Sequence, residues 1–231
     1  MQGLLLVDKP VGWTSFDVVN YIRRIVANEL GKKPKNVKVG HTGTLDPFAT
    51  GLLVVLIGKE YTKKAAELSK VEKTYELTAL LGETSTTGDP EGELKHVSEI
   101  APALIDVEKA CRELTGVIQQ TPPSYSAIKV NGKRSYELAR EGKEVKLNPR
   151  AVTIHNLKII EYSYPVIKMT CSVSSGTYIR SLVESIGEKL GTGAYTSALR
   201  RTQVGDYSIT DALDVKSITT DTLTQHLIYI S

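Results

Sequence analysis

Residues 37–57 read VKVGHTGTLDPFATGLLVVLI, two apolar segments joined by a loop that contains three glycines. The apolar segments, 37–39 and 52–57, predict two strands, and the loop between them carries Asp46 directly before Pro47. Proline disfavours the helical conformation of the preceding residue, so we expect an extended backbone at Asp46. Glycines allow a close approach of the loop to a large polymer. We interpret this loop as the mount of a catalytic carboxylate, with an Asx-type turn as the alternative.

The segments on either side of this loop predict a mixture of strands and helices. A helix capped by Thr14 or Ser15 is expected to end at Gly31. Further strands are predicted at residues 3–7, 74–81, 152–161 and 166–172, helices at 61–68, 106–114, 135–140 and 177–190, loops at 82–92 and 116–124, and a tight turn at Asn131-Gly132. Because strands do not alternate regularly with helices, we expect an α+β fold with a mixed, largely antiparallel sheet.

Length and composition indicate one soluble globular domain. The 231 residues are 41% hydrophobic and 24% charged, and no linker or repeat divides them. We therefore expect a single domain over residues 1–231 that can include a loop-rich insertion at 83–150. No apolar run is long enough to span a bilayer and no signal peptide is evident, so a cytoplasmic location is expected. Cys111 and Cys171 match no disulfide or zinc pattern and are interpreted as reduced packing residues.

Basic residues are clustered although the net charge is only +3. They precede the glycine loop, follow it and recur later in the chain: Arg23, Arg24, Lys32, Lys33, Lys35, Lys38, Lys59, Lys63, Lys64, Lys129, Lys133, Arg134, Arg140, Arg200 and Arg201. From Asp206 onward the balance reverses. Such a basic body could bind phosphates on one face. The alternative is that these cations are ordinary solvated helix faces.

Three further side chains could act with Asp46. Arg180 could form a bidentate ion pair with the Asp46 carboxylate and keep it ionised, or it could form a surface pair with Glu184, four residues on. Tyr75 lies on the apolar face of its predicted strand and is either a core residue or a stacking surface for a base. His41 is either a turn residue or a wedge that fills the space left by a displaced base.

Spacing excludes several common sites. Gly58-Lys59 lacks the earlier glycine of a phosphate-binding P-loop, and Gly191, Gly193 and Ala194 do not complete a dinucleotide fingerprint. The four histidines are scattered along the chain, away from the cysteines. Asp46 is thus left without an obvious cofactor.

Six motifs are distributed along the chain. They are GLLLVDKPVGWTS at residues 3–15, GHTGTLDPFATG at 40–51, KTY at 73–75, PSYSAIKVNG at 123–132, SGTYIRSL at 175–182 and LRR at 199–201. In this order they resemble the bacterial TruB family of tRNA pseudouridine synthases. The resemblance covers nearly the whole chain to about Gly205, and the motifs are long and specific.

The resemblance implies a pseudouridine-synthase-like catalytic domain that isomerises uridine at position 55, in the T-loop of tRNA, without cofactor or metal. By motif it makes Asp46 the catalytic aspartate, Tyr75 the ring packed on the target base and Arg180 the partner of Asp46. It also implies substrate-binding roles for His41 in extrusion of the uridine, Lys9 and Pro10 in the floor of the site, Leu199 beside the base, and Thr44. Many relatives carry an additional C-terminal RNA-binding PUA domain, which we do not expect in this chain.

The expected partner is the T-arm of tRNA, bound by a monomer and without a membrane. Two other functions remain open: a guide-directed pseudouridine synthase inside a ribonucleoprotein, and a non-catalytic tRNA-folding chaperone. The chemical path is also open, since an aspartate could attack the ribose, attack C6 of the base or remove a ribose proton.

Overall fold

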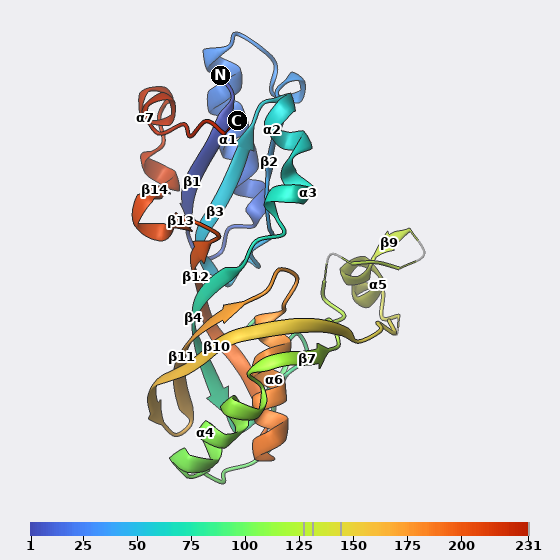
Figure 1. Ribbon diagram of the computed structural model, residues 1–231. Coiled ribbons are helices and arrows are strands. Elements are labelled where there is room, and N and C mark those ends of the chain that lie inside the picture. Colours follow the sequence, from blue (N-terminus) through green and yellow to red (C-terminus); the bar gives the residue numbers. More distant parts are fainter. Residues whose placement is uncertain (127, 131, 144, 231) are drawn as a thin grey trace. The chain divides into compact units, whose positions relative to one another are not determined.

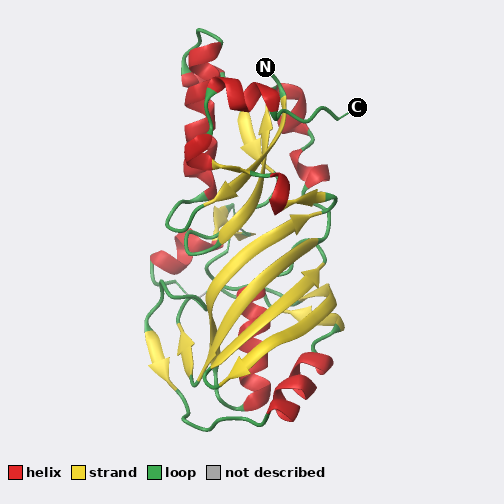
Figure 2. Ribbon diagram, turned by 90° about the vertical axis from the view of Figure 1, so that its left-hand side faces the viewer, coloured by secondary structure: helices red, strands yellow, loops and turns green. Residues whose placement is uncertain are grey.

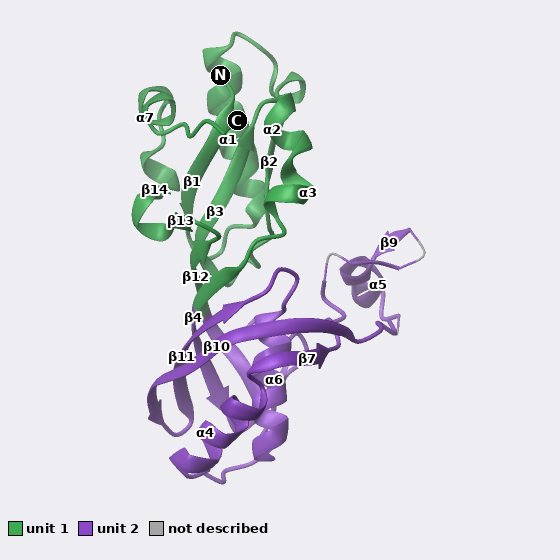
Figure 3. Ribbon diagram, in the orientation of Figure 1, with its two compact units in different colours: residues 1–75, 199–231 green, residues 76–198 purple. Residues whose placement is uncertain are grey.

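The computed structural model describes residues 1–126, 128–130, 132–143 and 145–230 (Figure 1). The chain groups into two compact units: unit 1 comprises residues 1–75 and 199–231, and unit 2 comprises residues 76–198 (Figure 3). Both boundaries fall inside strands, β4 (Lys73–Leu81) and β12 (Ala194–Val204). The predicted turn at Asn131-Gly132 and the PSYSAIKVNG motif include Asn131 and Ala127, which lie outside the described residues.

Unit 1 is built on a mixed sheet. Its other elements are β1 (Gly3–Lys9), α1 (Ser15–Glu29), η1 (Pro34–Asn36), β2 (Val39–His41), β3 (Thr50–Ile57), α2 (Lys59–Lys63), α3 (Ala65–Leu68), β13 (Tyr207–Ser208), η2 (Ile209–Asp211), β14 (Leu213–Asp214), η3 (Val215–Ser217) and α7 (Thr220–Gln225). The strand order is β14-β1-β3-β12. Strand β3 is antiparallel to β1 and β2 and parallel to β12. The loop with Asp46 therefore connects two neighbouring antiparallel strands.

Alternate residues of β1 and β3 point to opposite faces of this sheet and build two separate cores. On one face Leu5 and Val7 pack with Val18 and Ile22 of α1. On the other face Leu4 and Leu6 of β1, Leu52, Val54 and Leu56 of β3, Tyr61 of α2 and Val204 of β12 form the second cluster. Both faces of β1 and β3 are thus buried, which explains why these strands are continuous apolar runs.

Helix α1 begins and ends where its sequence predicts. The Thr14 hydroxyl accepts from the Asp17 amide, and the Asp17 carboxylate accepts from the Thr14 amide, which forms a capping box. These hydrogen bonds lower the pKa of Asp17. At the other end Gly31 has a φ of 59°, a left-handed conformation that favours glycine. Ser15, the first residue of the helix, is hydrogen-bonded to Leu45 in the loop of residues 42–49.

Unit 2 holds the remaining elements. They are β5 (Glu83–Ser85), β6 (Leu94–His96), α4 (Leu104–Glu113), β7 (Gly116–Gln120), β8 (Lys129–Val130), β9 (Lys133–Arg134), α5 (Ser135–Arg140), β10 (Arg150–Ser163), β11 (Val166–Val173) and α6 (Ile179–Leu190). Strands β4, β11, β10 and β7 lie in this order, and β10 is antiparallel to both of its neighbours. Figure 2 shows these strands side by side, with helices packed on one face of them. The architecture confirms the predicted α+β class.

Some local predictions were wrong. The predicted loop at 116–124 contains strand β7, because pairing of Ile118 with Val152 of β10 outweighs the adjacent glycine and prolines. The predicted loop at 82–92 contains β5, which pairs with β6. Asp106 lies in the first turn of α4, whose N-cap is Ala103.

Other boundaries differ by a few residues. The predicted strand at 37–39 lies at 39–41, and the predicted helix at 61–68 is two short helices divided at Lys64. Cys111 and Cys171 are buried and free. Within the described residues no helix is long and apolar enough to cross a bilayer.

Candidate active site

The loop of residues 42–49 holds Asp46 between strands β2 and β3. Residues 46–49 form a turn, since the Ala49 amide donates to the Asp46 carbonyl at 3.1 Å. The next carbonyl, that of Pro47, accepts from the Gly12 amide at 2.8 Å. The carbonyls of Asp46 and of the residue after it are therefore both held by backbone hydrogen bonds.

Lys9 ties the end of β1 to this loop. Its side chain is fully buried, and Nζ donates to the carbonyls of Pro10 at 2.9 Å, Trp13 at 2.6 Å and Pro47 at 3.4 Å. A buried ammonium is costly unless hydrogen bonds replace its hydration, and these carbonyls supply that replacement. Lys9 and the backbone of Pro10 thus support the segment that carries Asp46. Their contact with substrate stays a prediction.

Ser15, the first residue of α1, contacts the loop from a second direction. Its hydroxyl donates to the Leu45 carbonyl at 3.0 Å and accepts from the Leu45 amide at 2.8 Å. Both residues are buried. The residue directly before Asp46 therefore has both backbone groups paired with one side chain.

Arg201 supports the loop from the sheet. Arg201 is 1% exposed. The sequence places it among the cations that could bind phosphates, and for this residue that prediction was wrong. Its guanidinium donates to the carbonyls of Gly43 at 3.1 Å, Thr44 at 3.5 Å and Leu52 at 2.8 Å. Gly51 makes this packing possible: its φ is 103°, and a Cβ there would lie 2.3 Å from the Arg201 carbonyl oxygen. Thr44 itself is exposed.

Another buried cation, Lys73, lies beside Arg201. A Cβ built on Gly43 would be 3.6 Å from both Lys73 Cε and Arg201 Nη1, so both side chains lie against that glycine. Burial, and then the Arg201 charge, lower the pKa of Lys73 to about 8. At pH 7 the lysine is still mostly protonated. The side chains of Lys73 and Arg201 therefore both pack against Gly43 of the glycine loop.

The aromatic and apolar candidates of unit 1 are partly or fully buried. Tyr75 is 6% exposed and Leu199 8%. His41 ends strand β2, and its Nδ1 is buried without a hydrogen-bond partner. Burial, and then Arg201, lower the pKa of His41 below its usual value, so the imidazole is neutral at pH 7. The unpartnered nitrogen gives His41 a hydrogen-bonding capacity that the described part of the chain does not use.

Arg180 belongs to unit 2, near the start of α6. It is 4% exposed, and Nη1 and Nη2 donate to the carbonyls of Thr87 at 2.7 Å and Tyr125 at 2.9 Å. Its Nη1 also lies 3.4 Å from Asp89 Oδ2, and Asp89 is buried as well. Because Arg180 is buried, the alternative of an ordinary surface pair with Glu184 was wrong. Its ion pair with Asp46 stays a prediction.

The carboxyl of Glu184, near Arg180, has a raised pKa. Burial raises the pKa of Glu184 to about 7; the Arg180 charge opposes this rise, and Glu188 and Asp89 add to it. A Cβ on Gly88 would be 2.7 Å from the Glu184 Oε1 atom, so the carboxyl packs closely on that glycine. The folded protein thus retains a proton here that the unfolded chain loses at lower pH.

Glu184→Gln is therefore expected to make stability less sensitive to pH. The folded pKa lies above the unfolded value, so the wild-type free energy of unfolding falls as pH rises from about 4.5 to about 7, by at most about 3 kcal/mol. Urea unfolding at pH 5, 6, 7 and 8 should show the variant gaining stability over wild type across this window. Glu99→Gln, an exposed change elsewhere in the same unit, should give a constant difference. A constant difference for Glu184→Gln as well would contradict the assignment.

Comparison with known proteins decides the family. Residues 29–179 match the model described as "TruB family pseudouridylate synthase (N terminal domain)", and residues 180–229 match "tRNA pseudouridylate synthase B C-terminal domain". The chain belongs to the TruB family. Relatives named tRNA pseudouridine synthase B include those of Pseudomonas fluorescens, 42% identical over 94% of this chain and 68% of the relative, and Parabacteroides distasonis, 42% identical over 98% and 95%.

The fold is also similar to that of chains in solved structures. A chain in "Crystal Structure of a Cbf5-Nop10-Gar1 Complex" matches with a TM-score of 0.71 at 27% identity, over 95% of this chain and 54% of that chain. One in "Structure of H/ACA RNP bound to a substrate RNA containing 2'-deoxyuridine" matches with a TM-score of 0.67 at 25% identity, over 95% and 52%. This TruB-family chain therefore spans about half the length of those two chains.

The structure adds residues that sequence reasoning did not single out. Arg201, Lys73 and Ser15 support the Asp46 loop, and Asp89 faces Arg180. Arg201 and Lys73 do lie inside family motifs, LRR and KTY, which was the available signal. Among the described residues no cluster of His, Cys, Asp and Glu side chains is arranged to hold a metal ion.

Proposed function

We propose that the protein isomerises uridine to pseudouridine at position 55 in the T-loop of tRNA, with Asp46 as the catalytic residue. The observation that carries the proposal is the 42–43% identity, over nearly the whole chain, to proteins named tRNA pseudouridine synthase B. In the same proposal residues 1–231 act as one catalytic domain, as a monomer in the cytoplasm. Tyr75, Arg180 and His41 take the roles that their motifs imply.

The reaction rearranges bonds within one nucleotide. The N1–C1′ glycosidic bond breaks, the detached uracil turns, C5 bonds to C1′, and the C5 hydrogen leaves as a proton while N1 gains one. All three routes open to Asp46 need an ionised and oriented carboxylate. The hydrogen bonds at the Asp46 and Pro47 carbonyls fix the backbone that orients the carboxylate.

The target uridine must leave its stack before it can reach Asp46. Unstacking costs a few kcal/mol, and an aromatic face that stacks on the extruded base offsets part of this cost. Tyr75 supplies such a ring. His41 supplies a neutral imidazole with an unused nitrogen, which suits a residue that occupies the vacated space without adding charge.

Tritium release tests the reaction. The purified protein is incubated with a T-arm transcript labelled with tritium at C5 of its uridines, and with a matched transcript in which the target uridine is cytidine. Because C5 loses its hydrogen in the isomerisation, release of one equivalent from the first RNA and none from the second is expected. Absence of release from both, with RNA bound, would reject the enzyme assignment.

The same assay separates the two other functions. A guide-directed enzyme would require additional RNA or protein, so activity on the naked transcript with this chain alone argues against it. The identities also favour the tRNA enzyme, since the identity is 42% for the relative from Parabacteroides distasonis and 25% for the chain in the H/ACA RNP structure. A chaperone would fold tRNA without releasing tritium.

Tyr75→Leu is expected to lower kcat/KM about 5- to 150-fold, because stacking of one base on an aromatic ring contributes about 1 to 3 kcal/mol. Tyr75→Phe keeps the ring and should retain more of the activity. Tyr61→Leu removes another buried tyrosine of unit 1 and serves as the control for lost packing. Equal losses in Tyr75→Leu and Tyr61→Leu, assayed where both are folded, would show that Tyr75 acts only as a core residue.

A further inference from the structure

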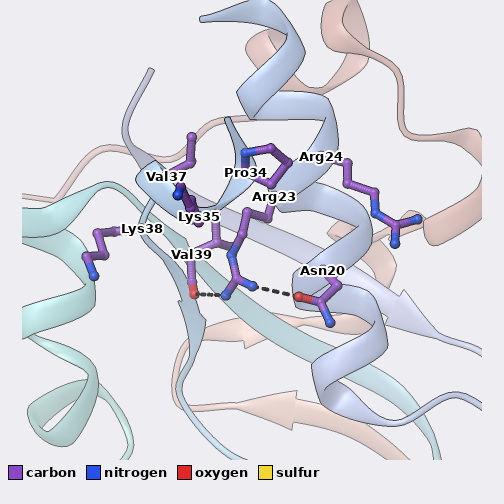
Figure 4. Close-up of a pocket in the computed structure, with 8 residues that line it drawn as sticks. All are labelled: Asn20, Arg23, Arg24, Pro34, Lys35, Val37, Lys38 and Val39. Carbon is purple, nitrogen blue, oxygen red and sulfur yellow. Dashed lines mark hydrogen bonds between the residues drawn. The ribbon is translucent and has the colours of Figure 1, made fainter. Parts of the chain in front are cut away.

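A basic hollow lies on unit 1, between the second half of α1, the η1 turn and the start of β2 (Figure 4). Its volume is about 650 Å³. Val37 and Val39 belong to the buried core beneath it, whereas Arg24, Lys35 and Lys38 are exposed. No acidic residue lines it. The hollow therefore presents several cations on a rigid apolar base.

Arg23 is held by two hydrogen bonds and an aromatic contact. Nη1 donates to Asn20 Oδ1 at 2.6 Å, Nη2 donates to the Val39 carbonyl at 3.2 Å, and the guanidinium lies 5.7 Å from the centre of the Phe16 ring. Figure 4 shows it between Lys38 and Arg24. In the part of the chain that the structure describes, none of the four cations of the hollow takes part in an ion pair, so their charges are not neutralised internally. A row of uncompensated cations is suited to a polyanion.

The hollow is connected to the candidate active site within unit 1. Strand β2 begins at Val39, in the wall of the hollow, and leads directly into the loop that carries Asp46. A second, smaller hollow shares Asn20 and Arg24 with the first and extends to Gly12, whose amide holds the Pro47 carbonyl. This second hollow includes Asp17, a negative charge, so phosphate binding is assigned to the first alone.

We propose that the hollow formed by Arg23, Arg24, Lys35 and Lys38 binds the phosphate backbone of the substrate RNA and holds it while a neighbouring nucleotide reaches the Asp46 loop. The proposal rests on the proposed function for its choice of RNA as the polyanion. Phosphate contacts of this kind position a nucleic acid without reading its sequence. These phosphate contacts affect the affinity for RNA and do not involve the reacting atoms.

Lys35→Ala/Lys38→Ala tests the proposal, because both side chains are exposed and can be removed without disturbing the core. The dissociation constant for the T-arm transcript should rise on the order of tenfold at low salt, as expected for two lost exposed ion pairs. The slope of log K against log salt should become shallower by about 1.4 to 1.8. kcat at saturating RNA should stay unchanged. Lys109→Ala/Lys216→Ala, two exposed lysines elsewhere, is the control of equal net charge.

The outcomes separate this proposal from the proposed function. If wild type releases tritium and the Lys35/Lys38 variant binds RNA like wild type, the hollow has another partner, such as an acidic protein segment, and the proposal is overturned. An equal weakening in the Lys109/Lys216 control would overturn it too, because only net charge would then matter. If wild type binds the transcript but releases no tritium, the proposed function fails, while the binding comparison still decides the role of the hollow.

Discussion

Asp46→Asn is expected to lower kcat for pseudouridine formation by on the order of 10⁴-fold, the scale on which loss of an essential catalytic side chain acts. The amide matches the carboxylate in size but carries no charge, so it can neither attack a carbon nor accept a proton at neutral pH. The loop should keep its conformation, because its hydrogen bonds from Lys9, Ser15 and Arg201 are made to backbone groups of its other residues.

Binding and reaction must be measured together for this variant. Tritium release gives kcat, and filter binding of the T-arm transcript gives the dissociation constant, which should stay within a few-fold of wild type. Asp206→Asn, an exposed aspartate of the same unit, is the matched control and should retain full activity. Wild-type turnover in Asp46→Asn would exclude Asp46 as the catalytic residue and with it the proposed mechanism.

Arg201→Met is expected to reduce the free energy of unfolding by about 3 to 5 kcal/mol. The guanidinium donates hydrogen bonds to the carbonyls of Gly43, Thr44 and Leu52. Each carbonyl that stays buried after this donor is lost lowers the free energy of unfolding by about 1 to 3 kcal/mol. Urea unfolding measures the loss. Activity should fall in parallel even at temperatures where the variant is folded, because the loop before Asp46 loses its anchor.

The neighbouring residue supplies the control for this prediction. Arg200 has a side chain that is 38% exposed, and it pairs with Asp8 through two hydrogen bonds, at 3.1 and 2.7 Å. A partly exposed pair of this kind contributes about 0 to 1 kcal/mol, so Arg200→Met should cost far less. Similar losses in the two variants would mean that burial at Arg201 does not govern its contribution.

The elements with a strong local signal could be predicted from the sequence. Helix α1 has apolar residues at helical spacing between a Thr14 cap and Gly31, and β4 alternates apolar and polar residues, so both were predicted within one or two residues. Candidate residues for the site could be named because they lie in long family motifs, and their roles stay predictions. A glycine loop ending in Asp-Pro is an informative local pattern on its own.

The remaining features depend on residues far apart in the chain. Strand β7 exists because it pairs with β10, more than thirty residues later, and its own sequence contains a glycine and leads into prolines. From the sequence, Arg201 was predicted to be a surface cation. Its burial could not be predicted, because its acceptors are the backbone carbonyls of residues 43, 44 and 52, and no side-chain pattern indicates them. Burial of Arg180 likewise depends on the carbonyls of Thr87 and Tyr125.

The reciprocal hydrogen bonds between Ser15 and Leu45 bear on how substrate affinity is determined. They couple the first turn of a long helix to the residue before Asp46, so the segment that carries Asp46 is already ordered when the protein is free. Preorganisation of this kind removes an entropic penalty from association. Nearly all of the conformational rearrangement on encounter then falls to the nucleic acid, and differences in affinity among RNAs should follow how readily each of them deforms.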